Sequence, residues 1–285
     1  MVKRSIKTIL IILTLSLSIY NFNLIQNRGN VTIDFVNVGQ GDSALISSAN
    51  GRHMLIDAGK ADSKTKENIS SIAYMRSIGV KKIDILSLSH YDDDHSGAAE
   101  AISELFDIEM LFVPEPKDDK DIIAFSQIAK ALPDETNVFF PETNDEVKIG
   151  EDITIKVLSI NNDGKESNDR SLILRIDAFD NSAIFTGDMD LKMEKNLLGA
   201  RTKEELDIDI AKVGHHGSKN ASSAEFYKAL TPIYSIISVG KNSYGHPTDE
   251  AMNNILASGS KIYRTDKDGG VRFIISKTGI KEKKI

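Results

Sequence analysis

Short apolar runs and amphipathic stretches alternate along the chain from residue 31 onward. The apolar runs are rich in Val, Ile and Phe and are bounded by Gly, Asn, Asp or Pro, which is typical of strands. Strands are predicted at 31–38, 44–48, 53–56, 83–88, 110–113, 138–140, 153–158, 172–178, 183–185, 209–213 and 233–239. Helical spacing of apolar residues predicts helices at 64–78, 98–106, 121–132, 189–198 and 248–257. This order predicts an α/β protein with two central sheets and helices on the outside.

The N-terminus carries a different pattern. Lys3, Arg4 and Lys7 precede an apolar run over residues 9–20, which is typical of a secretory signal or a signal-anchor. The run is short for a membrane-spanning helix, which needs ~20 apolar residues, but the poor cleavage site favours an uncleaved anchor. A buried N-terminal helix is the alternative.

This pattern predicts two parts of the chain. Residues 1–30 are expected to be the signal segment with a polar linker, and residues 31–285 one folded domain. Because positive charges stay in the cytoplasm, the domain is expected to be extracytoplasmic, either anchored to the cytoplasmic membrane or secreted. The basic residues 281–284 are expected to form a solvated tail.

The composition limits the chemistry. The net charge of -7 argues against a broad basic surface for nucleic acid. A local basic surface stays open, because metal ions can supply positive charge. The chain has no Cys, so disulfides, thiolate ligands and a cysteine nucleophile are excluded. A metal ion would have to be held by His and carboxylate side chains.

The densest chemistry lies on the loop 87–97, between a predicted strand and a predicted helix. His90, Asp92, Asp94 and His95 can turn to one side of this loop. Nitrogen and oxygen ligands at this density suit Zn²⁺, Mn²⁺ or another borderline cation. The alternative is a solvated acidic turn that caps the following helix through Ser96 or Asp94.

Two later strand ends also carry polar residues. Asp188 follows Gly187 and can point into a cleft, although capping of the next helix is the alternative. His215 and His216 lie between two glycines on a loop before a helix, which is a poor choice for a core. An accidental surface pair is the other interpretation.

The spacing His90-x-Asp92-x-Asp94-His95 resembles the H-x-H-x-D-H signature of the metallo-β-lactamase superfamily. Asp replaces the second His, as is usual in its ComEC/Rec2 branch, the competence-type DNA-uptake proteins. Further segments that resemble this branch are 38–42, 55–59, 186–188, 212–219 and 244–247. The resemblance implies an αββα four-layer metallo-β-lactamase fold over about residues 31–277, preceded by the N-terminal hydrophobic segment.

The resemblance also implies roles for single residues. Two divalent metal ions, Zn or Mn, are expected, with ligands His90, Asp92, Asp94, His95, Asp188 and His215. Asp94 and His246 are the expected catalytic residues. Residues expected near the metals or the substrate are Asp42, Asp57, His216, Ser218, Tyr244 and His246. The order of His215 and His216 stays open, and turn formation is an equal alternative for Asp42 and Asp57.

One usual ligand is missing. The superfamily supplies another His between the first motif and the bridging Asp188, but no His lies between His95 and His215. Asp169 could replace it. The carboxylate of Asp92 is a harder ligand than His and favours Mn²⁺ over Zn²⁺.

These features predict an exported or membrane-anchored metal-dependent hydrolase, with DNA or another phosphodiester as the expected substrate. Fold does not fix substrate, so hydrolysis of a β-lactam, a lactone or a choline phosphodiester is an alternative. A non-catalytic binding module of the same fold is another. Membrane contact is expected through the N-terminal segment, and no protein partner is inferred.

Overall fold

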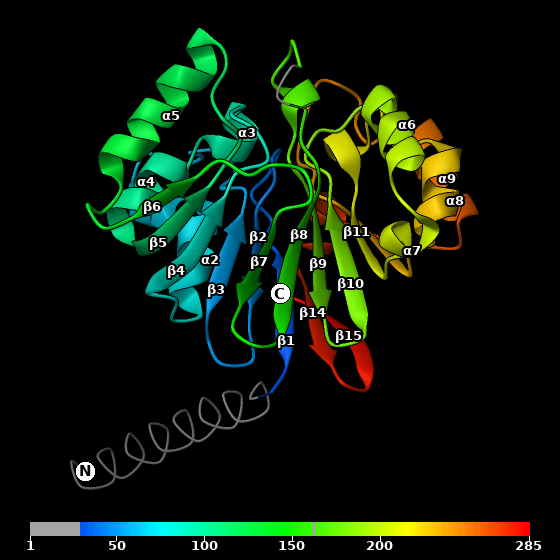
Figure 1. The fold of residues 1–285 in the computed structure, drawn as a ribbon, viewed down its shortest axis with the longest axis horizontal. Coiled ribbons are helices and arrows are strands. Elements are labelled where there is room, and N and C mark those ends of the chain that lie inside the picture. The colour runs from blue at the N-terminus through cyan, green and yellow to red at the C-terminus, as the bar shows by residue number, and fades with distance from the viewer. Residues whose placement is uncertain (1–28, 162–163) are drawn as a thin grey trace, which may run out of the picture.

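The computed structural model describes residues 29–161 and 164–285 of the chain. The predicted signal segment, apart from its last two residues, lies outside the described residues. Two sheets stack face to face, and helices cover the outer face of each, so that the molecule has four layers (Figure 1). This confirms the αββα arrangement predicted from the sequence. No helix within the described ranges combines the length and the hydrophobicity needed to cross a membrane.

The first sheet has eight strands and the second has seven, among the described residues. The order of the first is β15 (Gly279–Lys284), β14 (Val271–Ser276), β1 (Val31–Phe35), β2 (Ala44–Ser47), β3 (His53–Ile56), β4 (Lys82–Ser87), β5 (Asp107–Phe112) and β6 (Asn137–Phe139). The order of the second is β13 (Lys261–Arg264), β12 (Tyr234–Ile237), β11 (Ile210–Lys212), β10 (Asn181–Phe185), β9 (Ile173–Ala178), β8 (Ile153–Ser159) and β7 (Glu146–Ile149).

The helices form the outer layers. Beside the first sheet lie η1 (Lys66–Asn68), α2 (Ser70–Ser77), α3 (Asp93–Ser96), α4 (Ala99–Leu105) and α5 (Asp119–Ala131). Beside the second lie α6 (Leu191–Ala200), α7 (Lys203–Leu206), α8 (Ala224–Leu230) and α9 (Asp249–Ala257). Short turns of helix, placed between strands, are η2 (Asn168–Arg170), η3 (Gly214–Gly217) and α10 (Thr265–Asp268).

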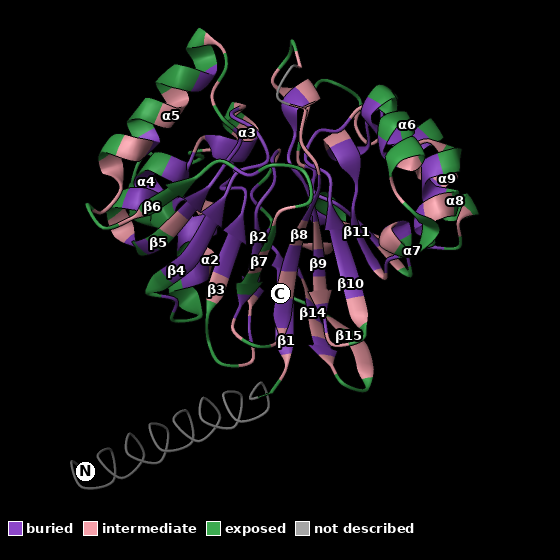
Figure 2. Cartoon of the chain, viewed as in Figure 1, coloured by how far each residue is buried: buried purple, intermediate pink, exposed green. Residues whose placement is uncertain are grey.

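Three apolar clusters hold the layers together. One fills the space between the two sheets, and one lies under the helices on each side. Strands such as β4 and β10 are therefore buried on both faces (Figure 2). A strand buried on both faces needs a continuous apolar run rather than alternation, which explains why such runs could be recognised in the sequence.

Parallel pairing fixes where the site forms. The strands β3, β4, β5 and β6 run parallel, as do β10, β11, β12 and β13. The carboxyl ends of parallel strands meet at one edge of a sheet, and the loops beyond that edge are where α/β proteins bind ligands. Polar residues that follow β3, β4, β10 and β11 are thereby brought together from distant parts of the chain.

Most predicted elements are present with small shifts at their ends. The predicted helix 64–78 is divided, because Ile69 has extended backbone angles between η1 and α2. The sequence analysis did not predict β7 or α7, and it gave no bounds for α8, the helix expected after the loop with His215 and His216. The basic residues 281–284 are not a free tail: they pair with β14 as β15, although their side chains remain largely exposed.

Candidate metal centre

The loop after β4 and the short helix α3 position the first group of candidate ligands. Asp92 occupies the N-cap position of α3, but its side chain forms no capping bond. Asp94 and His95 lie within the helix. The alternative of an acidic capping turn therefore fails, since these side chains face a polar cluster: His95 Nε2 lies 3.1 Å from Asp188 Oδ1, and Asp94 Oδ2 lies 3.4 Å from His216 Nε2.

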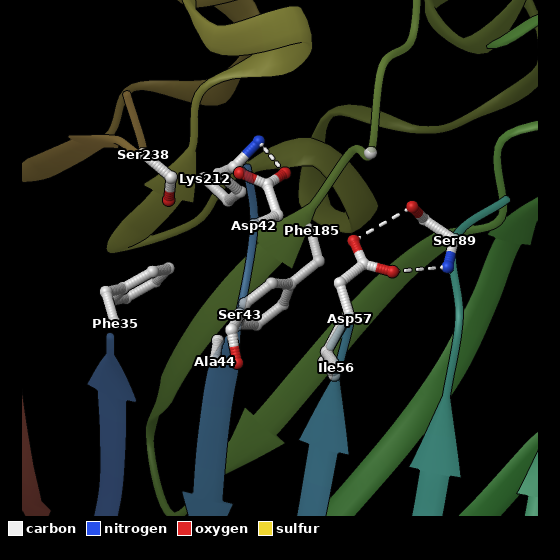
Figure 3. Close-up of a pocket in the computed structure, with 11 residues that line it drawn as sticks. Phe35, Asp42, Ser43, Ala44, Ile56, Asp57, Ser89, Phe185, Lys212 and Ser238 are labelled. Atoms are coloured by element: carbon white, nitrogen blue, oxygen red, sulfur yellow. Dashed lines mark hydrogen bonds and ion pairs between the residues drawn. The ribbon is translucent and has the colours of Figure 1, made fainter. Parts of the chain in front are cut away.

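Asp57, at the end of β3, orients His95. Its Oδ2 accepts a hydrogen bond from His95 Nδ1 at 2.8 Å. It also accepts bonds from the backbone N and the Oγ of Ser89, at 2.7 and 2.9 Å (Figure 3). Because a carboxylate only accepts hydrogen bonds, Nδ1 of His95 carries the proton, and the lone pair of Nε2 is directed into the cluster.

His90 is oriented in the same way by Ser89. The hydroxyl of Ser89 donates to Asp57, so its oxygen is left to accept a bond from His90 Nδ1 at 3.0 Å. The Nε2 of His90 then points into the cluster with its lone pair. Ser89 thus links two histidines to one carboxylate, a role that the sequence analysis did not assign.

Asp188 enters the cluster from the end of β10. Capping of the next helix is performed by Asp190, which accepts a bond from Met193 N, so the capping alternative for Asp188 fails. Gly187 has a φ of 50°, and a Cβ there would lie 2.8 Å from the Cβ of Ser89. Glycine is therefore needed for this turn to pass close to the β4 loop.

The two histidines after β11 take different positions. Both have left-handed backbone angles, but their side chains differ in burial and in their contacts. His216 is buried and donates from Nδ1 to the Ser238 carbonyl at 2.8 Å, which leaves the lone pair of Nε2 for the cluster. His215 is 27% exposed, with its Nε2 3.7 Å from Asp188 Oδ2. The sequence analysis preferred His215 as the ligand, whereas the groups of close ligand atoms contain His216 and not His215.

Four buried ligand atoms converge at this place. They are His90 Nε2, His95 Nε2, His216 Nε2 and Asp188 Oδ1, and none has a hydrogen-bond partner among the described residues. Ligand atoms of His90, His95 and Asp188 lie within 4.8 Å of one another, as do those of Asp94, His95 and His216. Because buried polar atoms are normally hydrogen-bonded, these donor sets fit divalent cations that accept nitrogen and oxygen ligands.

The electrostatics of the cluster agree with a cation site. Burial disfavours the charged imidazole of His95, but Asp188, Asp57 and Asp42 outweigh burial and raise its pKa well above the usual value. The same balance, with Asp188 and Asp42 as the main anions, raises the pKa of His216 to about 10. In the metal-free centre, protons on His95 and His216 therefore supply the positive charge that a bound cation would otherwise bring.

The carboxylates respond in the opposite direction. Burial acts to raise the pKa of Asp188, but His95 and His216 hold it well below the usual value. Burial also acts to raise the pKa of Asp94, but His216, 3.4 Å away, and His95 lower it to about 2. His90 differs: burial and the charge of His95 lower its pKa to about 4, so its imidazole is neutral and available to a cation at neutral pH.

The sequence model of the metallo-β-lactamase superfamily matches residues 36–241. The chain belongs to the metallo-β-lactamase superfamily. Its curated relatives include ComE operon protein 3 of Bacillus subtilis and competence protein ComA of Neisseria gonorrhoeae. Each is 29% identical over 91% of this chain. These are ComEC-type competence proteins, and the chain spans about a third of their length, 35% and 34% respectively.

Solved structures of the superfamily share the fold at low identity. The diiron β-hydroxylase CmlA from Streptomyces venezuelae superimposes with a TM-score of 0.58 at 14% identity, over 90% of this chain and 54% of that chain. Zn²⁺-bound PqqB from Methylobacterium extorquens gives a TM-score of 0.53 at 9% identity, over 79% of this chain and 85% of that chain. Both likenesses confirm the metallo-β-lactamase fold.

Beside the cluster lies an open cleft of about 190 Å³. Its lining residues are Gln40, Asp92, Asp94, Asn168, Asp188, His215, His216, Tyr244 and His246. Asp92 has one oxygen 3.8 Å from His90 Nε2 and the other in an ion pair with Lys120, at 2.6 Å. Ser218 is buried and is not among the residues that line the cleft; its Oγ accepts a bond from Asn220 N.

The segment in which the superfamily usually supplies a further histidine ligand forms the short helix η2 in this chain. Asp169 was the predicted replacement, but it belongs to none of the close ligand groups in the described chain, and its carboxylate lies near Glu166 N at 3.4 Å. Asn168 lines the cleft instead. Asn168 and Asp169 are consecutive residues of the turn η2 and point in different directions, and sequence spacing alone did not show which one faces the site.

Proposed function

We propose that this chain is a metal-dependent hydrolase that cleaves phosphodiesters, with DNA as a candidate substrate. The observation that carries the proposal is the convergence of four buried ligand atoms without hydrogen-bond partners among the described residues, at the base of an open cleft. The competence-type relatives support a phosphodiester over the other substrates of this fold. Two divalent ions bound there would lower the pKa of water and stabilise the charge on an attacked phosphoryl group.

The residues divide into two proposed ligand sets around Asp188. One proposed set is His90 with Asp92, whose oxygen lies 3.8 Å from His90 Nε2, and the other is Asp94, His95 and His216. Asp92 belongs to none of the close ligand groups in the described chain, and the His90 set has only one histidine, so the two ions are expected to differ in affinity. Mn²⁺ suits this oxygen-rich set, and Zn²⁺ remains the alternative.

His246 is the proposed group that meets the substrate. It lines the cleft, and its buried Nδ1 has no hydrogen-bond partner within the described part of the chain. Asn242 fixes the loop, because its Oδ1 accepts from His246 N while its Nδ2 donates to His246 O. Burial and the neighbouring His215 and His216 lower the pKa of His246. A neutral imidazole at pH 7 can hydrogen-bond a phosphate oxygen or exchange a proton with the leaving group.

The location of the domain is part of the proposal. Lys3, Arg4 and Lys7 ahead of the apolar run at 9–20 favour a domain outside the cytoplasmic membrane. An extracytoplasmic hydrolase would meet DNA or another external phosphodiester before it enters the cell.

The decisive experiment combines metal analysis with a substrate panel. The domain is purified without chelator, its Mn, Zn and Fe content is determined, and turnover of bis-p-nitrophenyl phosphate, single-stranded DNA and nitrocefin is measured. We expect metal-dependent cleavage of the phosphodiesters and none of nitrocefin. Turnover of nitrocefin alone would identify another hydrolase. Bound metal without any turnover would favour a binding module and contradict the proposal.

A further inference from the structure

Lys212, the last residue of β11, is a buried lysine beneath the metal centre. Only 3% of its surface is exposed, and lysine is almost never buried unless it is paired. Its Nζ forms an ion pair with Asp42 (Figure 3). It also donates to the Val213 carbonyl at 2.8 Å. The ligand sets and the substrate group described above give this charge no role.

Asp42 lies under both buried histidines of one ligand set. Its Oδ1 is 3.5 Å from His216 Nδ1 and its Oδ2 is 3.6 Å from His95 Nδ1. These are the nitrogens opposite to the Nε2 atoms that face the cluster. Gly41 has no Cβ, which would lie 2.4 Å from the Asp94 carbonyl oxygen, and this close approach lets Asp42 N donate to Asp94 O at 3.0 Å.

Asp42 is also close enough to act as a ligand itself. Ligand atoms of Asp42, Asp188 and His216 lie within 4.8 Å of one another. A carboxylate at that distance is attracted to a bound cation, and a positive charge beside the carboxylate opposes that attraction. Lys212 is the cation that contacts it, and Lys212 has the largest lowering effect on the pKa of Asp42, against the raising effect of burial.

The pair is shielded from bulk water. The cavity next to it has a volume of only about 10 Å³, and the rings of Phe35 and Phe185 are part of its lining (Figure 3). This volume is at the lower limit for one water molecule. Solvent therefore cannot replace the Lys212 charge, and loss of the lysine would leave a buried carboxylate without its partner.

We propose that Lys212 is a positioning residue of the metal centre. Its charge holds Asp42 beside the Nδ1 atoms of His95 and His216, so that Asp42 does not become a metal ligand. The proposal rests on the proposed function only in requiring that the centre binds a divalent ion. The proposal predicts opposite effects on metal affinity for the two partners. Substitution of Lys212 removes a positive charge near the cation, whereas substitution of Asp42 removes a negative charge.

The experiment is a double-mutant cycle read by Co²⁺ binding. Co²⁺ affinity and the visible absorption of the bound ion are measured for the wild type, Lys212→Met, Asp42→Asn and the double variant. Lys212→Met should bind Co²⁺ about 10–100-fold more tightly, with a changed spectrum as Asp42 joins the ligands. Asp42→Asn should bind about 10–100-fold more weakly. The double variant should return close to the wild type.

A matched control is Lys156→Met, which removes a lysine from β8 of the same sheet that pairs with Asp177 at 3.1 Å. It should leave affinity and spectrum unchanged. If Lys212→Met folds only when metal is present, that dependence supports the proposal, because the ion then replaces the missing charge. If it fails to fold in either condition, the double variant decides: wild-type affinity supports the proposal, and lost binding or failure to fold contradicts it.

Other outcomes separate this proposal from the proposed function. Weaker binding in both single variants, or additive losses in the double variant, would show a purely structural role and overturn the proposal. Wild-type protein that binds Co²⁺ but cleaves no phosphodiester would contradict the proposed function and leave the cycle valid. Wild-type protein that binds no divalent ion would overturn both, and this is seen before any variant is made.

Discussion

At the scale of single residues, the centre is defined by which nitrogen of each histidine faces the cluster. His216 presents a buried Nε2 to Asp94 and Asp188, whereas His215 is partly exposed. His216→Ala should therefore remove at least one metal ion per chain, while His215→Ala should retain both. Elemental analysis after dialysis measures this directly. Loss of metal from His215→Ala alone would return the ligand role to His215.

His246 should act on the substrate and not on the metal. Its Nδ1 is buried in the cleft wall, and it belongs to none of the close ligand groups in the described residues. His246→Ala should keep the metal content and lower kcat for a phosphodiester by about 10²–10⁴-fold. Tyr244→Phe is the neighbouring control and should have a much smaller effect. A metal-free His246→Ala protein would show that this residue is a ligand.

Metal binding should depend on pH through the same nitrogens. Because the pKa of His216 is raised to about 10 and that of His95 is also raised, the metal-free centre holds protons at neutral pH that a cation must displace. The apparent affinity should thus rise from neutral pH towards pH 10 and fall as the pH decreases. Calorimetry in two buffers of different ionisation enthalpy should detect proton release. Equal binding enthalpies in the two buffers would contradict the expectation.

At the scale of elements, contacts between distant segments hold the rim of the cleft. Arg170 ends η2, next to Asn168, and its buried guanidinium pairs with Asp118 and Asp121 of the first turn of α5, at 2.6 and 2.7 Å. It also donates to the Gly164 and Lys165 carbonyls. This network fixes the segment in which the superfamily usually places a histidine ligand.

Arg170→Met should destabilise the fold and leave the metal ligands in place. The change leaves the carboxylate of Asp121 buried without its partner, which costs about 3–5 kcal/mol. Urea unfolding should show this loss in the free energy of unfolding, while metal content stays at the wild-type value. The double variant Arg170→Met with Asp121→Asn should recover part of the stability. An unchanged unfolding midpoint for the single variant would show that the pair is not coupled to the fold.

At the scale of the whole molecule, the open question is the side of the membrane on which the domain works. The basic residues ahead of the apolar run at 9–20 predict that it lies outside the cytoplasm. Protease added to intact, wall-stripped cells should therefore degrade the domain, while a cytoplasmic marker protein stays whole. Protection of both proteins until lysis would place the domain inside.

The sequence by itself determined the fold class and the position of the site in the chain. Continuous apolar runs predicted the doubly buried strands, and the polar residues that follow β4, β10 and β11 predicted a metal centre at their ends. Those features are local, since a strand and the loop after it are read from adjacent residues. Strands at the surface, such as β7 and β15, have weaker apolar patterns, because a position that faces solvent can carry a polar or an apolar side chain.

Only the tertiary structure decided which side chains cooperate. The loop after β11 placed His216 and not His215 in the cluster, and the turn at η2 faced Asn168 rather than Asp169 towards the cleft. Ser89 and Lys212 gained roles through partners 32 and 170 positions away, Asp57 and Asp42. A charged residue inside an apolar strand pattern was the only local sign of Lys212. Its partner is fixed by the packing of one sheet on the other, which no short stretch of sequence encodes.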